Sequence, residues 1–267
     1  MVCERPTEAV GLPLSARRTG ATVLASLDQI TELAAESAIA HYDWPHRGPA
    51  PIGYVKGMAV CYARVYCRYQ SGDAAVLCMA AADGNAPNTD ALSWYHDEFA
   101  AQGMSNTING IDTLRHLFVL LMGLGMRESS GRYCEGRDTS ADNTSGDTAE
   151  AGTFQVSYNA CRAGLLRGLY ESYQGKTDFL PIFREGVIPT PSDLINWGTG
   201  EGVSFQQLTK SCPLFAAEFA ALALRMERTH WGPINRRDAE LRPECDALFL
   251  AVENAVAASD LCPLLVG

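Results

Sequence analysis

The sequence has few basic residues and no extended apolar segment. Its 267 residues include 21 Lys and Arg against 31 Asp and Glu, which gives a formal net charge of -10 and a pI of about 5.0. The chain therefore lacks the broad basic surface through which proteins bind nucleic acid or anionic membranes. Its longest apolar stretch, residues 117–126, is too short to span a bilayer. The composition predicts neither a nucleic-acid partner nor a membrane partner.

The chain also lacks the sequence motifs of several enzyme classes. It has no GxSxG elbow of serine hydrolases, no P-loop and no dinucleotide-binding glycine fingerprint. None of its 9 cysteines forms the CxxC pair of a zinc site, so we expect neither a metal nor another cofactor. An odd and high number of cysteines is compatible with some disulfides and with buried free thiols, and the sequence leaves both open.

No linker, low-complexity segment or internal repeat divides the chain. We therefore expect one domain over residues 1–267, with a helical N-terminal extension. Residues 1–20 lack the charged-then-apolar pattern of a signal peptide. Either the protein is not exported by that route or the sequence begins after a removed signal. A secreted or periplasmic location is favoured, and a cytoplasmic one stays open.

The hydrophobic pattern is mainly helical. Apolar residues at three- and four-residue steps predict helices over residues 22–41, 53–69, 89–101, 111–127, 212–230 and 236–259. The helix over 111–127 is apolar nearly all round, which places it at the centre of the fold. Turn-forming residues predict a loop or short hairpin over 131–153, a turn over 231–235 and an irregular edge over 176–203. The last helix should start late or bend at Pro243.

The central helix meets a carboxylate where its apolar pattern stops, at Glu128. Burial disfavours the ionised form of such a group and raises its pKa, so that it can act as a general acid near neutral pH. Glycoside hydrolysis needs an acid of this kind to protonate the leaving oxygen, together with a second carboxylate in a different environment. The acid-rich loop that follows supplies candidates for the second group.

Two short motifs around this loop resemble the lysozyme superfamily. They are "ESS" at 128–130 and "EAGTFQVS" at 150–157, separated by the polar loop. Hen-type lysozymes carry Glu-Ser at the end of their central helix and a Gly-x-x-Gln pattern after a hairpin. Goose-type lysozymes and lytic transglycosylases carry Glu-Ser followed by a Gly-x-x-Gln pattern. The resemblance covers about 30 residues. It implies a mainly α (α+β) lysozyme-like catalytic domain: a central buried helix, a small β-hairpin or loop region, and surrounding helices.

The resemblance also assigns roles to individual residues. Glu128 matches the catalytic acid, and Gln155 matches the Gln that lines the sugar cleft. Glu150 falls where hen-type lysozymes carry their second carboxylate, but they have Asp there, and the loop is longer in this chain. Goose-type and chitosanase-like relatives take the water-activating Asp from the loop, which leaves three further candidates: Asp138, Asp142 and Asp147. The segment "THWGPINRR" at 229–237 is a loose counterpart of a late Tyr motif and receives no role.

Several aromatic and polar side chains could contact a sugar. Tyr158 and Asn159 could line a sugar subsite, because aromatic faces stack on sugar rings, although core packing explains Tyr158 equally well. Trp197 and Trp231 lie in turns rich in Gly and Pro, where an exposed indole could form the floor of a cleft. His116 lies within the apolar helix and is expected to be a hydrogen-bonded core residue.

These features together predict an endo-acting glycoside hydrolase whose partner is a β-1,4-linked polysaccharide or oligosaccharide. Carboxyl groups about 5 Å apart would predict retention of configuration, and about 6.5–9.5 Å would predict inversion. The alternatives are a lytic transglycosylase acting on peptidoglycan, a non-catalytic carbohydrate-binding protein and an unrelated helical protein. The acidic pI favours a free polysaccharide over an anionic cell wall, and a cationic glycan would be attracted.

Overall fold

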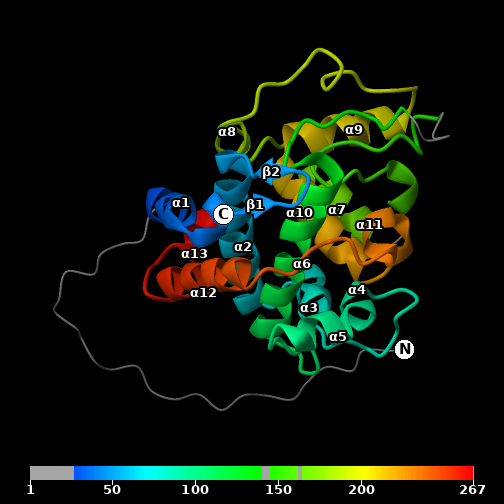
Figure 1. Cartoon of the computed structure of the whole chain (residues 1–267). Helices are drawn as coiled ribbons and strands as arrows, with labels where there is room; N and C mark the ends of the chain where they lie inside the picture. Colours follow the sequence, from blue (N-terminus) through cyan, green and yellow to red (C-terminus); the bar gives the residue numbers. More distant parts are fainter. Residues whose placement is uncertain (1–26, 140–144, 162–163, 267) are drawn as a thin grey trace.

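The computed structural model describes residues 27–139, 145–161 and 164–266. Two helices that are buried along most of their length form the centre, α6 (Ile111–Ser129) and α10 (Pro213–Leu224). Helix α2 (Ile52–Gln70) packs against both of them. Figure 1 shows α1, α12 and α13 on one side of these helices and α7, α9 and α11 on the other.

The remaining elements vary in length. The longer helices among them are α1 (Leu27–Glu36), α7 (Leu165–Tyr173), α9 (Glu201–Ser211) and α12 (Pro243–Ala257). Shorter helices are α3 (Ala74–Met79), α4 (Ala91–Trp94), α5 (His96–Ala101), α8 (Leu180–Phe183), α11 (Gly232–Asn235) and α13 (Cys262–Val266). The 3-10 turns are η1 (Ala38–His41), η2 (Tyr158–Ala160) and η3 (Arg228–His230), and the strands are β1 (Asp43–Trp44) and β2 (Gly48–Pro49).

The mainly helical class is confirmed, and the central position of the 111–127 helix is also confirmed. Three helix boundaries differ from the sequence prediction. The first helix ends at Glu36 and a 3-10 turn follows, the 89–101 helix breaks at Tyr95, and the 212–230 helix ends at Leu224. Within the predicted turn over 231–235, Gly232–Asn235 form a single helical turn. The last helix begins at Pro243, where proline is tolerated as the first helical residue, which confirms the predicted late start.

The two-stranded sheet lies elsewhere than the sequence suggested. We expected any hairpin within residues 131–153, but β1 and β2 pair antiparallel before α2, with Trp44 opposite Gly48. In the described part of the 131–153 region and its immediate continuation, extended pairing is limited to one antiparallel bridge between Ala151 and Val156. The polar loop is therefore mostly irregular, as its turn-forming residues predict.

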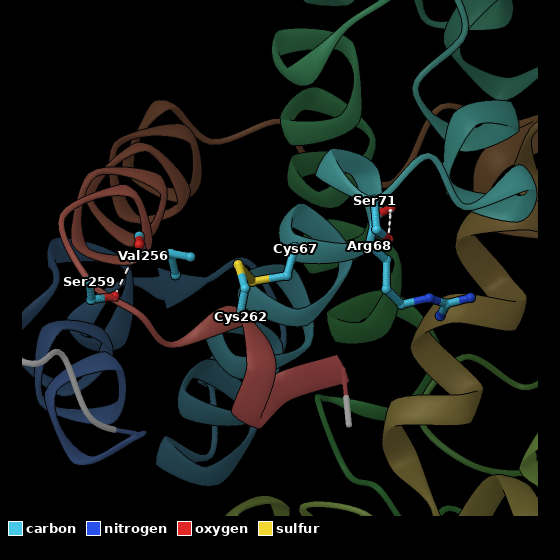
Figure 2. Close-up of a disulfide and its surroundings, with 6 residues drawn as sticks. All are labelled: Cys67, Arg68, Ser71, Val256, Ser259 and Cys262. Atoms are coloured by element: carbon cyan, nitrogen blue, oxygen red, sulfur yellow. Dashed lines mark hydrogen bonds between the residues drawn. A yellow bond between two sulfur atoms is a disulfide. The ribbon is translucent and has the colours of Figure 1, made fainter. Parts of the chain in front are cut away.

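A disulfide joins α2 to the last helix, α13. Cys67 near the end of α2 is bonded to Cys262 at the start of α13, across 195 residues of sequence (Figure 2). Figure 2 also shows the neighbouring Arg68 side chain pointing away from the disulfide, and its guanidinium pairs with Glu218 of α10. The six other described cysteines are free thiols. Both expectations for the cysteines, a disulfide and buried thiols, are thus present.

Two further expectations concern single residues and membrane helices. His116 is buried, and its Nδ1 lies 2.8 Å from Oδ1 of Asn106, so it is the hydrogen-bonded core residue that we predicted. Within the described ranges, no helix combines the length and the apolar character needed to cross a membrane.

Candidate active site

The C-terminal end of α6 presents Glu128. The helix runs close to the Tyr54 ring at Gly125, where any side chain would collide with the tyrosine hydroxyl. It then closes with Ser130 in the left-handed conformation, and the Gly131 amide donates a hydrogen bond to the Gly125 carbonyl (3.1 Å). This arrangement satisfies carbonyl groups at the helix end and fixes the direction of the last turn. Glu128 is consequently held at the border between the buried helix and the surface.

A polar cleft of about 370 Å³ lies at this end of α6. Four regions contribute to its lining: the β1–β2 turn, the end of α6, the loop after α6 and the segment around α11. The lining residues are Arg47, Arg127, Glu128, Asp138, Glu150, Gln155, His230, Trp231, Gly232, Pro233 and Arg236. A second cavity of about 310 Å³ between α7 and α9 contains no Asp, Glu or His, so it lacks a group for acid catalysis.

Two carboxyl groups in the cleft hold their protons unusually strongly. Burial and the nearby charge of Glu150 raise the pKa of Glu128 to about 8, against the opposing effect of Arg47 and Arg236. Burial and the charge of Asp138 raise the pKa of Glu150 to about 7. Like charges in one water-poor site cannot all ionise together, which is how acidic groups with separate roles are arranged in enzymes. The cleft therefore contains a carboxylic acid that is protonated at neutral pH.

A tight turn carries Gln155 into the cleft. Residues 151–156 fold back on themselves through the Ala151–Val156 bridge, and Gly152 (φ 77) and Gln155 (φ 46) both adopt left-handed conformations. The Gly152 amide donates to the carbonyl of Glu135 (2.9 Å), which fastens the turn to the preceding loop. The Gln155 amide nitrogen donates to the Gly152 carbonyl (3.1 Å), so this side chain also makes the local backbone contact that we considered as its alternative role.

Side chains from α6 and from the 230–231 segment hold this turn in place. Three consecutive carbonyl groups accept hydrogen bonds: Thr153 from Ser129 Oγ (2.8 Å), Phe154 from Trp231 Nε1 (2.7 Å) and Gln155 from His230 Nε2 (3.3 Å). Each bond satisfies a carbonyl group that is shielded from water. The two residues of the "Glu-Ser" pair thus have different roles: Glu128 faces the cleft, and Ser129 binds the tight turn.

His230 is an uncharged member of the cleft at neutral pH. Its burial lowers its pKa, because the charged imidazolium is poorly solvated there. Since Nε2 donates to the Gln155 carbonyl, the second ring nitrogen, Nδ1, is the unprotonated one in the neutral ring. His230 can therefore accept a proton or a hydrogen bond through Nδ1 while its other nitrogen is occupied.

The structure places the predicted site residues in three groups. Glu128, Glu150, Asp138 and Gln155 all line the cleft. The cleft lining does not include the other candidates described here, which are Asp147, Tyr158 and Asn159. Asp142 lies outside the described residues.

The three candidates outside the lining have other contacts. Asp147 is exposed, and its carbonyl accepts from the Asn159 amide (2.9 Å). Tyr158 packs against Tyr170 and Phe205, which agrees with the core-packing alternative. The Asn159 side chain accepts from Ser157 Oγ (2.6 Å). These contacts give each residue a structural role in the segment that follows the tight turn.

The two tryptophans differ from the expectation of exposed indoles at the cleft floor. Trp231 does line the cleft, but only 2% of it is exposed, because its indole is held against the Phe154 carbonyl. Trp197 is 43% exposed and lies outside the lining, with the Arg137 guanidinium 4.3 Å from its ring centre.

Sequence reasoning missed two of the three arginines that line the cleft, Arg47 and Arg236. Arg47 comes from the turn between β1 and β2, some 80 residues before Glu128, and no local pattern marks it. Arg236 belongs to the segment 229–237, to which the sequence assigned no role. The only signal for that segment was the loose similarity of "THWGPINRR" to a late motif of lytic transglycosylases. This segment packs against the tight turn through contacts between residues that are distant in the sequence, so no local pattern reveals them.

No group of three or more His, Cys, Asp or Glu side chains suited to a metal ion occurs among the described residues. Comparisons of the chain with models of protein families, with curated proteins and with solved structures found no match.

Proposed function

We propose that this protein is an endo-acting glycoside hydrolase that cleaves a β-1,4-linked polysaccharide. The observation that carries the proposal is the raised pKa of Glu128, about 8, in a cleft that also holds Glu150 and Asp138. A protonated carboxylic acid at neutral pH is the group that glycosidic bond cleavage requires and that most other hydrolyses do not. The resemblance of residues 128–130 and 150–157 to lysozymes supports the same reading.

In the proposed reaction, Glu128 donates its proton to the leaving glycosidic oxygen as the bond to the anomeric carbon breaks. Glu150 has the lower pKa, about 7, so it ionises before Glu128 and is available as the second carboxylate. It would either bond to the anomeric carbon or accept a proton from the attacking water. Asp138 is the other carboxylate in the cleft that can take this role.

The pH profile of kcat/KM distinguishes Glu150 from Asp138. If Glu150 must be ionised, activity falls as the pH drops through about 7, and it falls again above about 8 as Glu128 loses its proton. The profile would then be narrow and bell-shaped. If Asp138 is the second carboxylate, activity persists well below the pKa of Glu150, since Glu150 need not ionise.

The test of the function is a product analysis on a panel of polysaccharides, with wild type and Glu128→Gln measured side by side. The panel includes chitin, chitosan, mannan, cellulose, polyuronates and peptidoglycan, and products are followed as reducing ends and by mass. We expect oligosaccharides from at least one polymer and a loss of activity of about 100-fold or more in the variant. Thermal stability at acidic pH shows whether the variant is folded.

Other outcomes would replace the proposal. Products that end in an anhydro sugar would make the protein a lytic transglycosylase. Equal activity in wild type and variant would remove Glu128 from the mechanism. Binding to a glycan without turnover by wild type would leave a carbohydrate-binding protein.

A further inference from the structure

Three arginines concentrate positive charge around the acidic groups of the cleft. Arg47 comes from the β1–β2 turn, Arg127 precedes Glu128 in α6, and Arg236 follows α11. A guanidinium stays charged at every working pH. Because the whole chain carries a net charge of -10, the sign of this local cluster is opposite to that of the protein as a whole.

The arginines are only partly neutralised by their neighbours. Asp238 serves two of them: its Oδ2 lies 2.8 Å from Nε of Arg236 and 3.9 Å from a terminal nitrogen of Arg127. Arg47 donates to the main-chain carbonyl of Arg127 and forms no salt bridge with a described residue. Since Arg47 is exposed and has five N–H donors, most of its hydrogen-bonding capacity is available to a ligand.

The two glutamates of the cleft do not neutralise the arginines while they are protonated. While Glu128 and Glu150 remain protonated, the remaining carboxylate in the lining is that of Asp138. Three guanidinium groups then face Asp138 and the shared carboxylate of Asp238. The cleft has an excess of positive charge while both glutamates are protonated, that is, below the pKa of about 7 at which Glu150 ionises.

We infer that the ligand of this cleft is a glycan whose sugar rings carry carboxylate groups, and that Arg47 and Arg236 bind those carboxylates. Guanidinium groups pair with carboxylates through two parallel hydrogen bonds, which gives both attraction and orientation. As a statement about the substrate, the inference rests on the proposed glycosidase function. As a statement about binding, it needs only the cleft. It also reverses the expectation from net charge, because a cationic glycan such as chitosan would meet three arginines.

The experiment measures binding calorimetrically in the Glu128→Gln background, so that turnover does not consume the ligand. The first pair of probes is a β-1,4-linked oligoglucuronate and the cello-oligosaccharide of equal length, which has the same rings and linkage without the carboxylates. A muramic-acid-containing oligosaccharide, whose carboxylate lies on an ether side group, is the second acidic probe. A chitosan oligomer is the cationic one.

We expect an acidic probe to bind at least about tenfold more tightly than the neutral one, because each guanidinium contact with a carboxylate is charge-assisted. Adding Arg47→Gln should remove most of this preference and change the affinity for the neutral probe less than about twofold. The matched control is Arg184→Gln, which makes the same change in net charge at an exposed position after α8, outside the cleft. It should leave both affinities as they were.

Three results would overturn the inference: equal affinity for acidic and neutral probes, tighter binding of the chitosan oligomer, or no binding of any probe. A preference that Arg47→Gln leaves intact would also overturn it. Preference for the uronate or for the muramic-acid probe identifies where the carboxylate lies. Arginine-dependent binding of an acidic glycan that wild type does not cleave would refute the glycosidase and keep the inference. Cleavage of neutral glycans at a rate that Arg47→Gln leaves unchanged would support the glycosidase and refute the inference of an acidic glycan.

Discussion

Replacing Glu128 with Gln should stabilise the folded protein at alkaline pH and change its stability little at acidic pH. In the folded chain the carboxyl keeps its proton up to a pKa of about 8, whereas the unfolded chain releases it near the ordinary value of 4.5. Between these values the folded state binds more protons than the unfolded state. The stability of wild type therefore falls as the pH rises through this window, and is fully present only below it. Gln keeps the size and polarity of the side chain without the ionisation.

The size of the effect follows from the two pKa values. A rise from 4.5 to about 8 sets a ceiling of about 5 kcal/mol, at about 1.4 kcal/mol for each tenfold change in the ionisation constant. Glu128 is partly exposed, and part of its shift comes from the charge of Glu150, so water screening reduces the effect. We expect Glu128→Gln to raise the free energy of unfolding by about 1–3 kcal/mol at high pH.

Urea denaturation followed by circular dichroism measures this difference at about pH 5 and about pH 9, on either side of most of the window. The matched control is Glu32→Gln on α1, an exposed acid outside the cleft, which should shift the free energy of unfolding by less than about 0.5 kcal/mol at both pH values. A Glu128→Gln variant that is equally or less stable than wild type at the higher pH would refute the assignment of a raised pKa to this residue.

Three further changes test other parts of the account. Asp138→Asn removes a negative charge beside the two glutamates, so both of their pKa values should fall, and a pH titration of kcat/KM should show its alkaline limb at lower pH. Ser129→Ala leaves the Thr153 carbonyl without its side-chain partner, and urea unfolding should show a loss of about 1–3 kcal/mol. Cys67→Ser opens the disulfide to Cys262, and thermal unfolding should show a loss of about 2–5 kcal/mol that wild type reproduces under reducing conditions.

The central helix and its terminal acid could be predicted because their signal is local. The apolar pattern over 111–127 fixes a buried helix, and Glu128 is the first acid after it. Burial at that point disfavours the ionised carboxylate and therefore raises the pKa of Glu128. Asp138 and Glu150 were also identified from the sequence as candidates, because the loop that carries them directly follows the helix.

The remainder of the site depends on contacts between distant segments. The position of Arg47 at the end of α6 requires the β1–β2 turn to pack there, and the pattern of residues 43–49 does not reveal it. The 229–237 segment enters the cleft because His230 and Trp231 donate hydrogen bonds to main-chain carbonyl groups of the tight turn. Every residue has a main-chain carbonyl group, so the sequence of the turn does not reveal these contacts. Cys67 likewise forms its disulfide with Cys262 because α13 packs against α2.

The proposed mechanism depends most on the protonation of Glu128 near neutral pH. The direct measurement is a carbon-13 NMR titration of the glutamate side-chain carboxyl groups, in which the signal that disappears in Glu128→Gln identifies the residue. We predict that this signal titrates with a pKa of about 8, and that a second signal, lost in Glu150→Gln, titrates with a pKa of about 7. Titration of the Glu128 signal at the ordinary value of an exposed glutamate would contradict the proposal, because Glu128 would then be ionised at neutral pH and could not protonate a leaving oxygen.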